Sequence, residues 1–399
     1  MKKYILLTLI STMIFASLGT APILAEESGD EDKKENTENQ LNLAESAQSA
    51  ILLERDTGKI IYEKNAHDQL PPASMTKIMT LILIMQALDE ETIKLDEKVR
   101  VSENAASMGG SQIFLEAGEE MTVKDLLKGV AVASGNDASV ALAERIAGSE
   151  DAFVQMMNNK VAELGLENTR FQNTTGLPVD DHYSTAYDMG VMAKELLKHK
   201  EITEYTSIYE DYLRKGTEDE FWLVNTNKLV KFYPGVDGLK TGFTTLAKYC
   251  LTATAEKNNM RLVAVVMGAE TPKKRNSDVS QMLDYGFARY ETTQLFKQNQ
   301  PVTKLNLIKA DQDNVDIITE DSVSILHEKG KKLEDVSTIV KLDNDLQLPL
   351  KKGDKVGVLQ VTNNNELLSE TEIVVSKDVK NANIFTLFKR SFEELLKNR

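Results

Sequence analysis

Ser74 and Lys77 lie three residues apart, immediately before an apolar stretch that extends from Ile78 to Leu88. On a helix this spacing places two side chains one above the other on one face. A serine hydroxyl becomes an effective nucleophile when a nearby base takes its proton, and a lysine amine can be that base if burial or a second cation lowers its pKa. The pair therefore indicates an activated serine, although a helix-capping serine followed by an exposed lysine would have the same spacing.

Ser134 and Asn136 form a second candidate pair, in the segment ASGND between two stretches with helical periodicity. A polar turn between two helices can direct a hydroxyl and an amide into a cleft. The alternative is purely structural, with a glycine that ends one helix and a residue that caps the next. Ser102 and Asn104 have the same spacing, but they lack the two flanking helices and are the weaker candidates.

Lys240, Thr241 and Gly242 form a third candidate group, in the sequence PGVDGLKTGF. The pattern predicts a strand over 236–242, and a glycine there allows a ligand to lie close against the backbone. A strand lysine followed by a turn glycine is the structural alternative.

The elements around these residues can be predicted from the same sequence. Pro71 and Pro72 suit the approach to a helix that begins near Ala73 or Ser74, and its apolar continuation is expected to be buried on all sides. Further expected elements are a β-hairpin over 50–66 that turns at Gly58, helices over 121–134, 151–165 and 186–199, an antiparallel meander over 236–242, 249–255 and 261–268, and a helix over 276–292.

Composition and the termini limit the classes of protein that are possible. The chain of 399 residues has a formal net charge of −15 and a pI near 5.0, which disfavours a nucleic-acid partner. Cys250 is the one cysteine, so no internal disulfide can form. Residues 1–25 are typical of a signal peptide, with cleavage expected after Ala25, and residues 26–44 of an acidic, disordered leader. We therefore expect the protein outside the bacterial cytoplasmic membrane.

Together, and in this order, the three groups resemble the motifs of the penicillin-recognising serine enzymes. Ser134-Gly135-Asn136, the context PGVDGLKTG and the chain length resemble the low-molecular-mass penicillin-binding proteins that are serine-type D-alanyl-D-alanine carboxypeptidases. The resemblance covers about residues 45–390. It implies an α+β catalytic domain over 45–295, in which helices flank an antiparallel sheet as in β-lactamases and transpeptidases.

The resemblance also implies a role for each motif residue. Ser74 would attack the carbonyl between two D-alanines of a peptidoglycan stem peptide, with Lys77 as the general base. Ser134 would pass a proton to the departing D-alanine, and Asn136 would hold the substrate amide and Lys77. The resulting acyl-enzyme would be hydrolysed by water, and β-lactam antibiotics would acylate the same serine.

Four further residues are implied to bind the substrate. Lys240, Thr241 and Gly242 would bind the terminal carboxylate and adjoining backbone, and the guanidinium of Arg275 suits the two carboxylate oxygens. The alternative for Arg275 is a solvent-facing side chain in a basic cluster. The backbone N–H groups of Ser74 and Phe243 would bind the oxyanion. Phe243 replaces a histidine of some relatives, and the loop over 176–183 departs from their pattern and receives no role.

The C-terminal third predicts a second, all-β domain over 296–380, a sandwich of short alternating strands that would raise the active site above a surface. Residues 381–399 place Ile384, Phe388 and several further apolar side chains on one helical face. This amphipathic helix is expected to attach the protein to the outer face of the membrane, although it could instead pack on the sandwich.

Several alternatives remain open at this point. A class A-like β-lactamase would need a glutamate to activate water, and no E-x-x-L-N sequence occurs between Asn136 and Lys240, although Glu163 and Glu167 are present. A cross-linking transpeptidase is disfavoured because no long amino-terminal module precedes the motifs. A catalytically silent penicillin-binding sensor or scaffold is the alternative from a different class. His182 in a Ser-His-Asp arrangement has little support, and no cofactor or metal site is expected.

Overall fold

The computed structural model describes residues 41–390 except 308, 313, 332, 334, 365, 385 and 389. The predicted signal peptide over 1–25, nearly all of the leader over 26–44 and the end of the predicted helix over 381–399 therefore lie outside the described residues. Within that helix, residues 384, 386–388 and 390 are helical.

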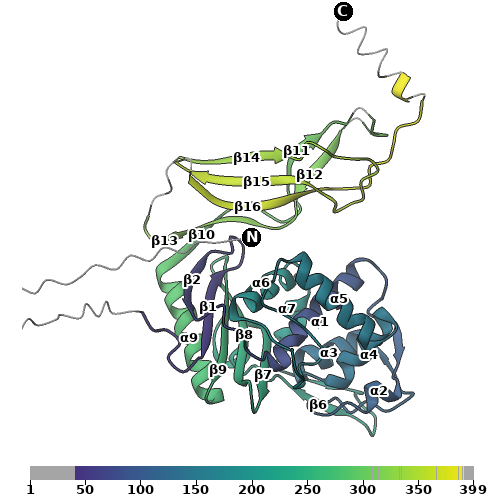
Figure 1. Ribbon diagram of the computed structural model, residues 1–399, viewed down its shortest axis with the longest axis vertical. Helices are drawn as coiled ribbons and strands as arrows, with labels where there is room; N and C mark the ends of the chain where they lie inside the picture. Colours follow the sequence, from purple (N-terminus) through teal and green to yellow (C-terminus); the bar gives the residue numbers. More distant parts are fainter. Residues whose placement is uncertain are drawn as a thin grey trace, which may run out of the picture. The chain divides into compact units, whose positions relative to one another are not determined.

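A five-stranded antiparallel sheet forms the centre of the catalytic domain, in the strand order β2-β1-β9-β8-β7 (Figure 1). Alternate residues of its strands enter two different hydrophobic cores: Ile51 and Val265 pack toward α1 and α6, whereas Leu52 and Ala264 pack toward α9. The strands are β1 (Ser49–Glu54), β2 (Ile60–Lys64), β7 (Val236–Thr244), β8 (Lys248–Lys257) and β9 (Met260–Ala269). The predicted hairpin, the meander and the α+β class are confirmed.

Helix α1 (Lys77–Asp89) is enclosed on all sides, as its uniformly apolar sequence predicts. Every residue from Lys77 to Met85 is buried. The helices that pack against it are α3 (Val123–Ala133), α4 (Asn136–Ala147), α5 (Glu150–Glu163) and α6 (Ala186–Leu196). Smaller elements complete the domain: η1 (Ala73–Thr76), α2 (Glu103–Ala106), α7 (Ile202–Thr206), α8 (Leu229–Phe232), β3 (Lys98–Arg100), β4 (Glu120–Thr122), β5 (Glu210–Leu213) and β6 (Phe221–Val224).

Helix α9 (Pro272–Arg289) begins and ends earlier than the predicted range of 276–292. The Thr271 hydroxyl accepts the Lys274 N–H, and Pro272 occupies the first turn, where its missing N–H costs nothing. The residues that follow Arg289 are rich in threonine and aromatic side chains and form strand β10 (Tyr290–Phe296) instead.

The C-terminal part is an all-β domain, as predicted. A five-stranded sheet has the order β11-β12-β16-β15-β14, and β10 pairs with β13 in a separate two-stranded sheet. One core contains side chains from both sheets, among them Ile325, Val361 and Ile373. The strands are β11 (Pro301–Leu305), β12 (Val315–Thr319), β13 (Val323–Glu328), β14 (Val336–Leu342), β15 (Lys355–Asn363) and β16 (Glu366–Val375).

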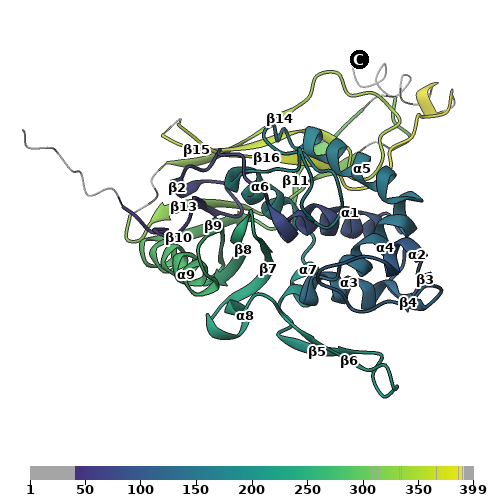
Figure 2. The same cartoon turned by 60° about the horizontal axis from the view of Figure 1, so that its bottom comes forward.

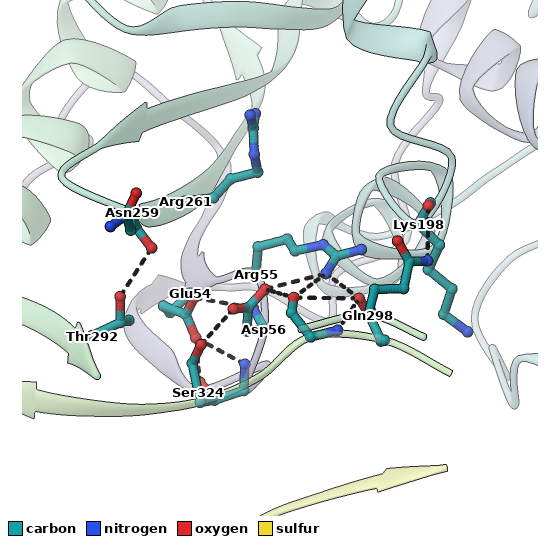
Figure 3. Close-up of polar contacts among 12 residues, drawn as sticks. Glu54, Arg55, Asp56, Lys198, Asn259, Arg261, Thr292, Gln298 and Ser324 are labelled. Carbon is teal, nitrogen blue, oxygen red and sulfur yellow. Dashed lines mark hydrogen bonds and ion pairs between the residues drawn. The ribbon is translucent and has the colours of Figure 1, made fainter. Parts of the chain in front are cut away.

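Buried polar contacts join the turn after β1 to the segment that leads into β13 (Figure 3). Arg55 forms an ion pair with Asp321, and both side chains are at least nine-tenths buried. The Asp56 carboxylate accepts hydrogen bonds from the hydroxyls of Ser322 at 2.7 Å and Ser324 at 2.6 Å. These contacts connect the catalytic domain to the second domain through polar groups that have little access to water.

Candidate active site

Ser74 and Lys77 lie at the transition from the 3-10 turn η1 to helix α1, so that the lysine is the first residue of the buried helix. The Lys77 amine has no exposed surface. Its Nζ lies 3.2 Å from Ser74 Oγ, 2.6 Å from Asn136 Oδ1 and 2.8 Å from the carbonyl oxygen of Thr175. The structure therefore brings together the first two predicted groups around one amine.

The surroundings of Lys77 favour its neutral form. Burial lowers its pKa well below the ordinary value, and the positive charge of Lys240 lowers it further, whereas Asp137 acts in the opposite direction. No carboxylate of the described residues is hydrogen-bonded to this amine. A neutral amine beside a serine hydroxyl is the arrangement that general-base activation requires.

Ser134 and Asn136 lie where α3 ends and α4 begins. Ser134 has a left-handed backbone with φ of 63°, and it ends α3 at the position often occupied by glycine. Its Oγ is buried and has no hydrogen-bond partner among the described residues. The Asn136 side chain donates to the Gly109 carbonyl at 2.6 Å, which directs its Oδ1 toward Lys77.

The competing pair, Ser102 and Asn104, has a structural role instead. The Ser102 hydroxyl caps α2 by accepting the Ala105 N–H at 2.9 Å, and Asn104 donates to the Glu144 carboxylate at the surface. Its lower ranking on sequence grounds agrees with these contacts.

The third group lies on β7, directly beside the turn that carries the serine. Lys240 has no exposed surface, and burial, followed by the charge of Arg275, lowers its pKa to about 7. A Cβ on Gly242 would lie 2.7 Å from the Pro72 carbonyl oxygen. Only glycine therefore allows β7 to approach η1 this closely. Thr241 Oγ1 donates to Thr226 Oγ1 at 2.8 Å.

Arg275 is buried rather than solvent-facing, with an exposed fraction of 5%. Its Nη1 lies 3.5 Å from the carbonyl oxygen of Cys250, the residue opposite Gly242 in the sheet, and its Nε and Nη2 donate to Asn276 Oδ1. Burial lowers the pKa of Arg275 to about 10. The guanidinium thus lies against β8, the strand paired with the third group, and its positive charge lowers the pKa of Lys240.

The Phe243 side chain is 55% exposed and stacks on Tyr249, with ring centroids 4.4 Å apart. It extends the surface at the end of β7 without contributing a titratable group. Cys250 is fully buried.

A second wall of the site comes from residues 172–183, which include the loop over 176–183 to which the sequence assigned no role. Gly176, with φ of +83°, lies so close to η1 that a Cβ would be 1.9 Å from the Ala73 carbonyl oxygen. The carbonyls of Thr174 and Thr175 accept hydrogen bonds from the Thr80 hydroxyl at 2.8 Å and from Lys77. Backbone groups supply these contacts, so no motif of side chains could have indicated them.

His182 belongs to this wall and bonds to Thr76, not to Ser74. Its Nε2 lies 2.8 Å from Thr76 Oγ1, and its Nδ1 accepts the Gln172 N–H at 3.1 Å, so Nε2 carries the proton and donates. Burial lowers the pKa of His182 to about 4, which keeps the ring neutral. These contacts give no support to a Ser-His-Asp arrangement.

A cavity of about 380 Å³ adjoins this wall, lined by residues including Ala73, Leu177, His182, Thr244 and Leu246. Its lining includes Ala73, the residue before the serine, but none of the motif residues. Among the described residues, no cluster of His, Cys, Asp or Glu could hold a metal ion.

An antiparallel sheet flanked by helices, with a serine and a buried lysine at the start of the central helix, defines a penicillin-recognising serine enzyme. A family model described as "D-alanyl-D-alanine carboxypeptidase" matches residues 34–271, and one described as "Penicillin-binding protein 5, C-terminal domain" matches residues 290–381. The chain belongs to the family of D-alanyl-D-alanine carboxypeptidases.

Individual relatives agree with this assignment. The D-alanyl-D-alanine carboxypeptidase DacF of Bacillus subtilis (strain 168) is 56% identical over 355 residues, which are 89% of this chain and 91% of DacF. Penicillin-binding protein 5 of Haemophilus influenzae has a similar structure, with a TM-score of 0.65 and 32% identity over 84% of this chain and 98% of that chain. Penicillin-binding protein D2 of Listeria monocytogenes, solved in a cefotaxime-bound form, has a TM-score of 0.55 and 33% identity over 61% of this chain and 97% of that chain.

Proposed function

We propose that the protein removes the terminal D-alanine from peptidoglycan stem peptides through an acyl-enzyme on Ser74. The observation that carries this proposal is the set of contacts around Lys77 Nζ. A neutral amine has two N–H bonds and one lone pair. Asn136 Oδ1 and the Thr175 carbonyl can accept only the N–H bonds. The lone pair is then left for the hydroxyl proton of Ser74.

In the acylation step, Lys77 takes this proton while Ser74 Oγ bonds to the carbonyl carbon between the two D-alanines. The carbonyl oxygen becomes an oxyanion, which the N–H groups of Ser74 and Phe243 would stabilise. Ser134 then donates its hydroxyl proton to the nitrogen of the departing D-alanine as the C–N bond breaks, and the Lys77 ammonium returns to Ser134 the proton that it took from Ser74. The buried Ser134 Oγ, which lacks a partner among the described residues, is free to do so. Water finally hydrolyses the ester and returns Ser74 to its starting state.

The free carboxylate of the substrate would be bound by Lys240 and Thr241, with the nearby guanidinium of Arg275 providing further positive charge. Gly242 allows the substrate backbone to lie along β7. β-Lactams present a carboxylate and a reactive carbonyl in a similar arrangement. We therefore expect them to acylate Ser74 and inhibit the enzyme.

Two alternatives make different demands on the site. A β-lactamase needs a carboxylate that activates water beside the ester, but Glu163 forms an ion pair with Lys160 at the end of α5. A catalytically silent sensor would have no need to keep the pKa of Lys77 depressed. Both alternatives remain outcomes of the experiment below.

We also propose that the chain acts on the outer side of the cytoplasmic membrane. A signal peptide over 1–25 would export it, and the C-terminal helix over 381–399 would attach it to the membrane beyond a catalytic domain over 45–295 and a β domain over 296–380. Ile384 and Phe388, one helical turn apart, are 84% and 74% exposed. No helix within residues 41–390, as far as they are described, is long and apolar enough to cross a membrane. Loss of liposome binding on deletion of 381–399 would support attachment, and unchanged binding would contradict it.

The decisive experiment measures D-alanine released from a soluble peptide that ends in D-alanyl-D-alanine, with the Ser74→Ala variant as control. We expect release only by the unaltered protein, and a covalent penicillin adduct on Ser74 by mass spectrometry. An adduct without any release would indicate a sensor. Rapid turnover of that adduct would instead indicate a β-lactamase.

A further inference from the structure

The hairpin of β5 and β6 carries two exposed aromatic side chains that the proposed chemistry does not use. Tyr212 and Trp222 are direct cross-strand partners and are 42% and 54% exposed. Figure 2 shows the hairpin projecting from the body of the catalytic domain. Because directly paired residues point to the same face, the two rings form one aromatic surface, here called the hairpin platform.

The opposite face of the hairpin packs against the catalytic domain, so the hairpin platform faces away from it. Leu213 and Leu223 are buried there, and Asp211 forms an ion pair of 2.8 Å with Lys128 of α3. Phe221 packs edge-on against Phe114, with ring centroids 5.5 Å apart. The inward side chains therefore hold the hairpin against the domain and leave the platform facing solvent.

The platform is continuous with the active site through β6 and the residues that follow it. Leu223 is buried on the inner face of β6, so strand alternation places Trp222 and Val224 on the other face, and Thr226 follows two residues after the strand ends, in a bend. Thr226 Oγ1 accepts the hydrogen bond of Thr241 in the third group. Four extended residues span at most about 13 Å, so Trp222 lies within that distance of Thr226 along the chain.

We infer that the hairpin platform binds the neutral glycan strand that bears the stem peptide. This inference rests on the proposed function, in which the peptide in the active site is a branch of a polysaccharide. Sugar rings present C–H groups on one face, and these pack well against the faces of aromatic rings. A strand held at the platform would bring its peptide branch toward Thr226 and Thr241.

The charges around the hairpin platform favour an uncharged ligand. Exposed Glu218, Asp219 and Glu220 lie in the turn of the hairpin, and Glu210 is exposed beside the platform. The turn also contains Arg214 and Lys215, but these form ion pairs with Glu119 and Asp211. The exposed carboxylates would repel anionic lipids and anionic polymers, whereas N-acetylated sugars carry no charge to be repelled. A glycan therefore fits this surface better than a membrane does.

Trp222 is the only tryptophan in the chain, so its fluorescence reports on the platform alone. We expect N-acetylglucosamine oligomers to change this fluorescence in a saturable way, in the full chain and in its Ser74→Ala variant alike. No change, or a change only with anionic vesicles, would overturn the inference. Because this readout does not depend on catalysis, it stays informative even if the protein releases no D-alanine.

The activity test compares a soluble peptide with glycan strands that carry the same peptide. In Trp222→Ala, we expect kcat/KM to fall about tenfold on the strands, as for loss of one well-packed aromatic contact, and to stay unchanged on the soluble peptide. Trp222→Phe should retain most of the activity on strands. Leu367→Ala is the matched control, because Leu367 is 53% exposed on β16 of the other domain, and it should alter neither substrate.

Three results would contradict the inference. Equal losses on both substrates would show that Trp222 supports the active site itself. Unchanged activity on the strands would show that the platform does not contact them. A dimer that dissociates on Trp222→Ala would identify the platform as a contact between two copies of the chain.

Discussion

Replacing Asn136 with aspartate tests whether Lys77 acts as a neutral base, with almost no change in shape. Asn136 Oδ1 lies 2.6 Å from Lys77 Nζ, so the substitution would place a carboxylate against the amine. At an effective dielectric constant of about 20, opposite unit charges this close attract by about 6 kcal/mol, or a factor of about 10⁴ in the affinity of the amine for its proton. Burial of the carboxylate opposes ionisation of the pair and offsets about half of this energy.

The remaining gain, about 3 kcal/mol, corresponds to a factor of about 100 in proton affinity. Asn136→Asp should therefore hold Lys77 in its ammonium form at neutral pH. We expect D-alanine release and the rate of acylation by penicillin to fall by about 100-fold, with part of the activity returning as the pH rises. The measurement is kcat/KM on a soluble peptide from pH 5 to pH 10, together with the acylation rate.

Asn104→Asp provides the control, since Asn104 has the same spacing from a serine but lies at the surface beside Glu144. It should leave the pH profile unchanged. The assignment of Lys77 as the neutral base would be refuted if Asn136→Asp remained folded, kept the rate of the unaltered protein and showed the same fall in kcat/KM toward low pH.

Three further predictions concern charge and backbone. Lys240, with a pKa of about 7, loses its charge as pH rises through that value. The kcat/KM profile should therefore fall on its alkaline side, and Lys240→Arg should move this limb upward; an unmoved limb would exclude Lys240 as its source. Gly176→Ala forces a Cβ to 1.9 Å from the Ala73 carbonyl oxygen at φ of +83°. It should lower the free energy of unfolding by at least about 2 kcal/mol in denaturant titration, and a smaller loss would mean that this wall of the site is adaptable. Arg55→Leu leaves Asp321 buried without its ion-pair partner and should cost about 3–5 kcal/mol, of which the double Arg55→Leu/Asp321→Leu variant should recover part; a double variant less stable than the single one would contradict this.

The fold was predictable where a short pattern determines burial. The apolar run after Lys77 required enclosure on every side, and two strand-like runs joined by the turn over 257–259 required an antiparallel meander. The first and last residues of α9 were harder to predict from the sequence. Thr271 as an N-cap and the β-branched residues after Arg289 compete with helical periodicity, and pairing with the distant β13 determines the outcome.

The candidate site was predictable to the extent that it consists of side chains in known motifs. Ser74, Lys77 and Asn136 meet at one amine, and Lys240 acts on it by charge. Arg275 could be placed by resemblance, but its burial depends on the packing of α9. The Thr175 carbonyl and the Thr76 bond to His182 could not be found in this way, because they depend on the path of a loop nearly 100 residues further along the chain.

That loop also explains how a lysine can remain without exposed surface at the start of a helix. Two oxygen acceptors bind its N–H groups, yet neither carries the charge that would keep an ammonium there. Two residues of the active site have unfavourable left-handed backbone conformations, Ala73 with φ of 48° and Ser134 with φ of 63°. Each such conformation costs about 1–3 kcal/mol. The rest of the domain must offset this cost, and the fully buried α1 provides the packing to do so. The burial of α1 thus holds Lys77 in a site that favours the neutral amine, which is the form that the proposed reaction needs.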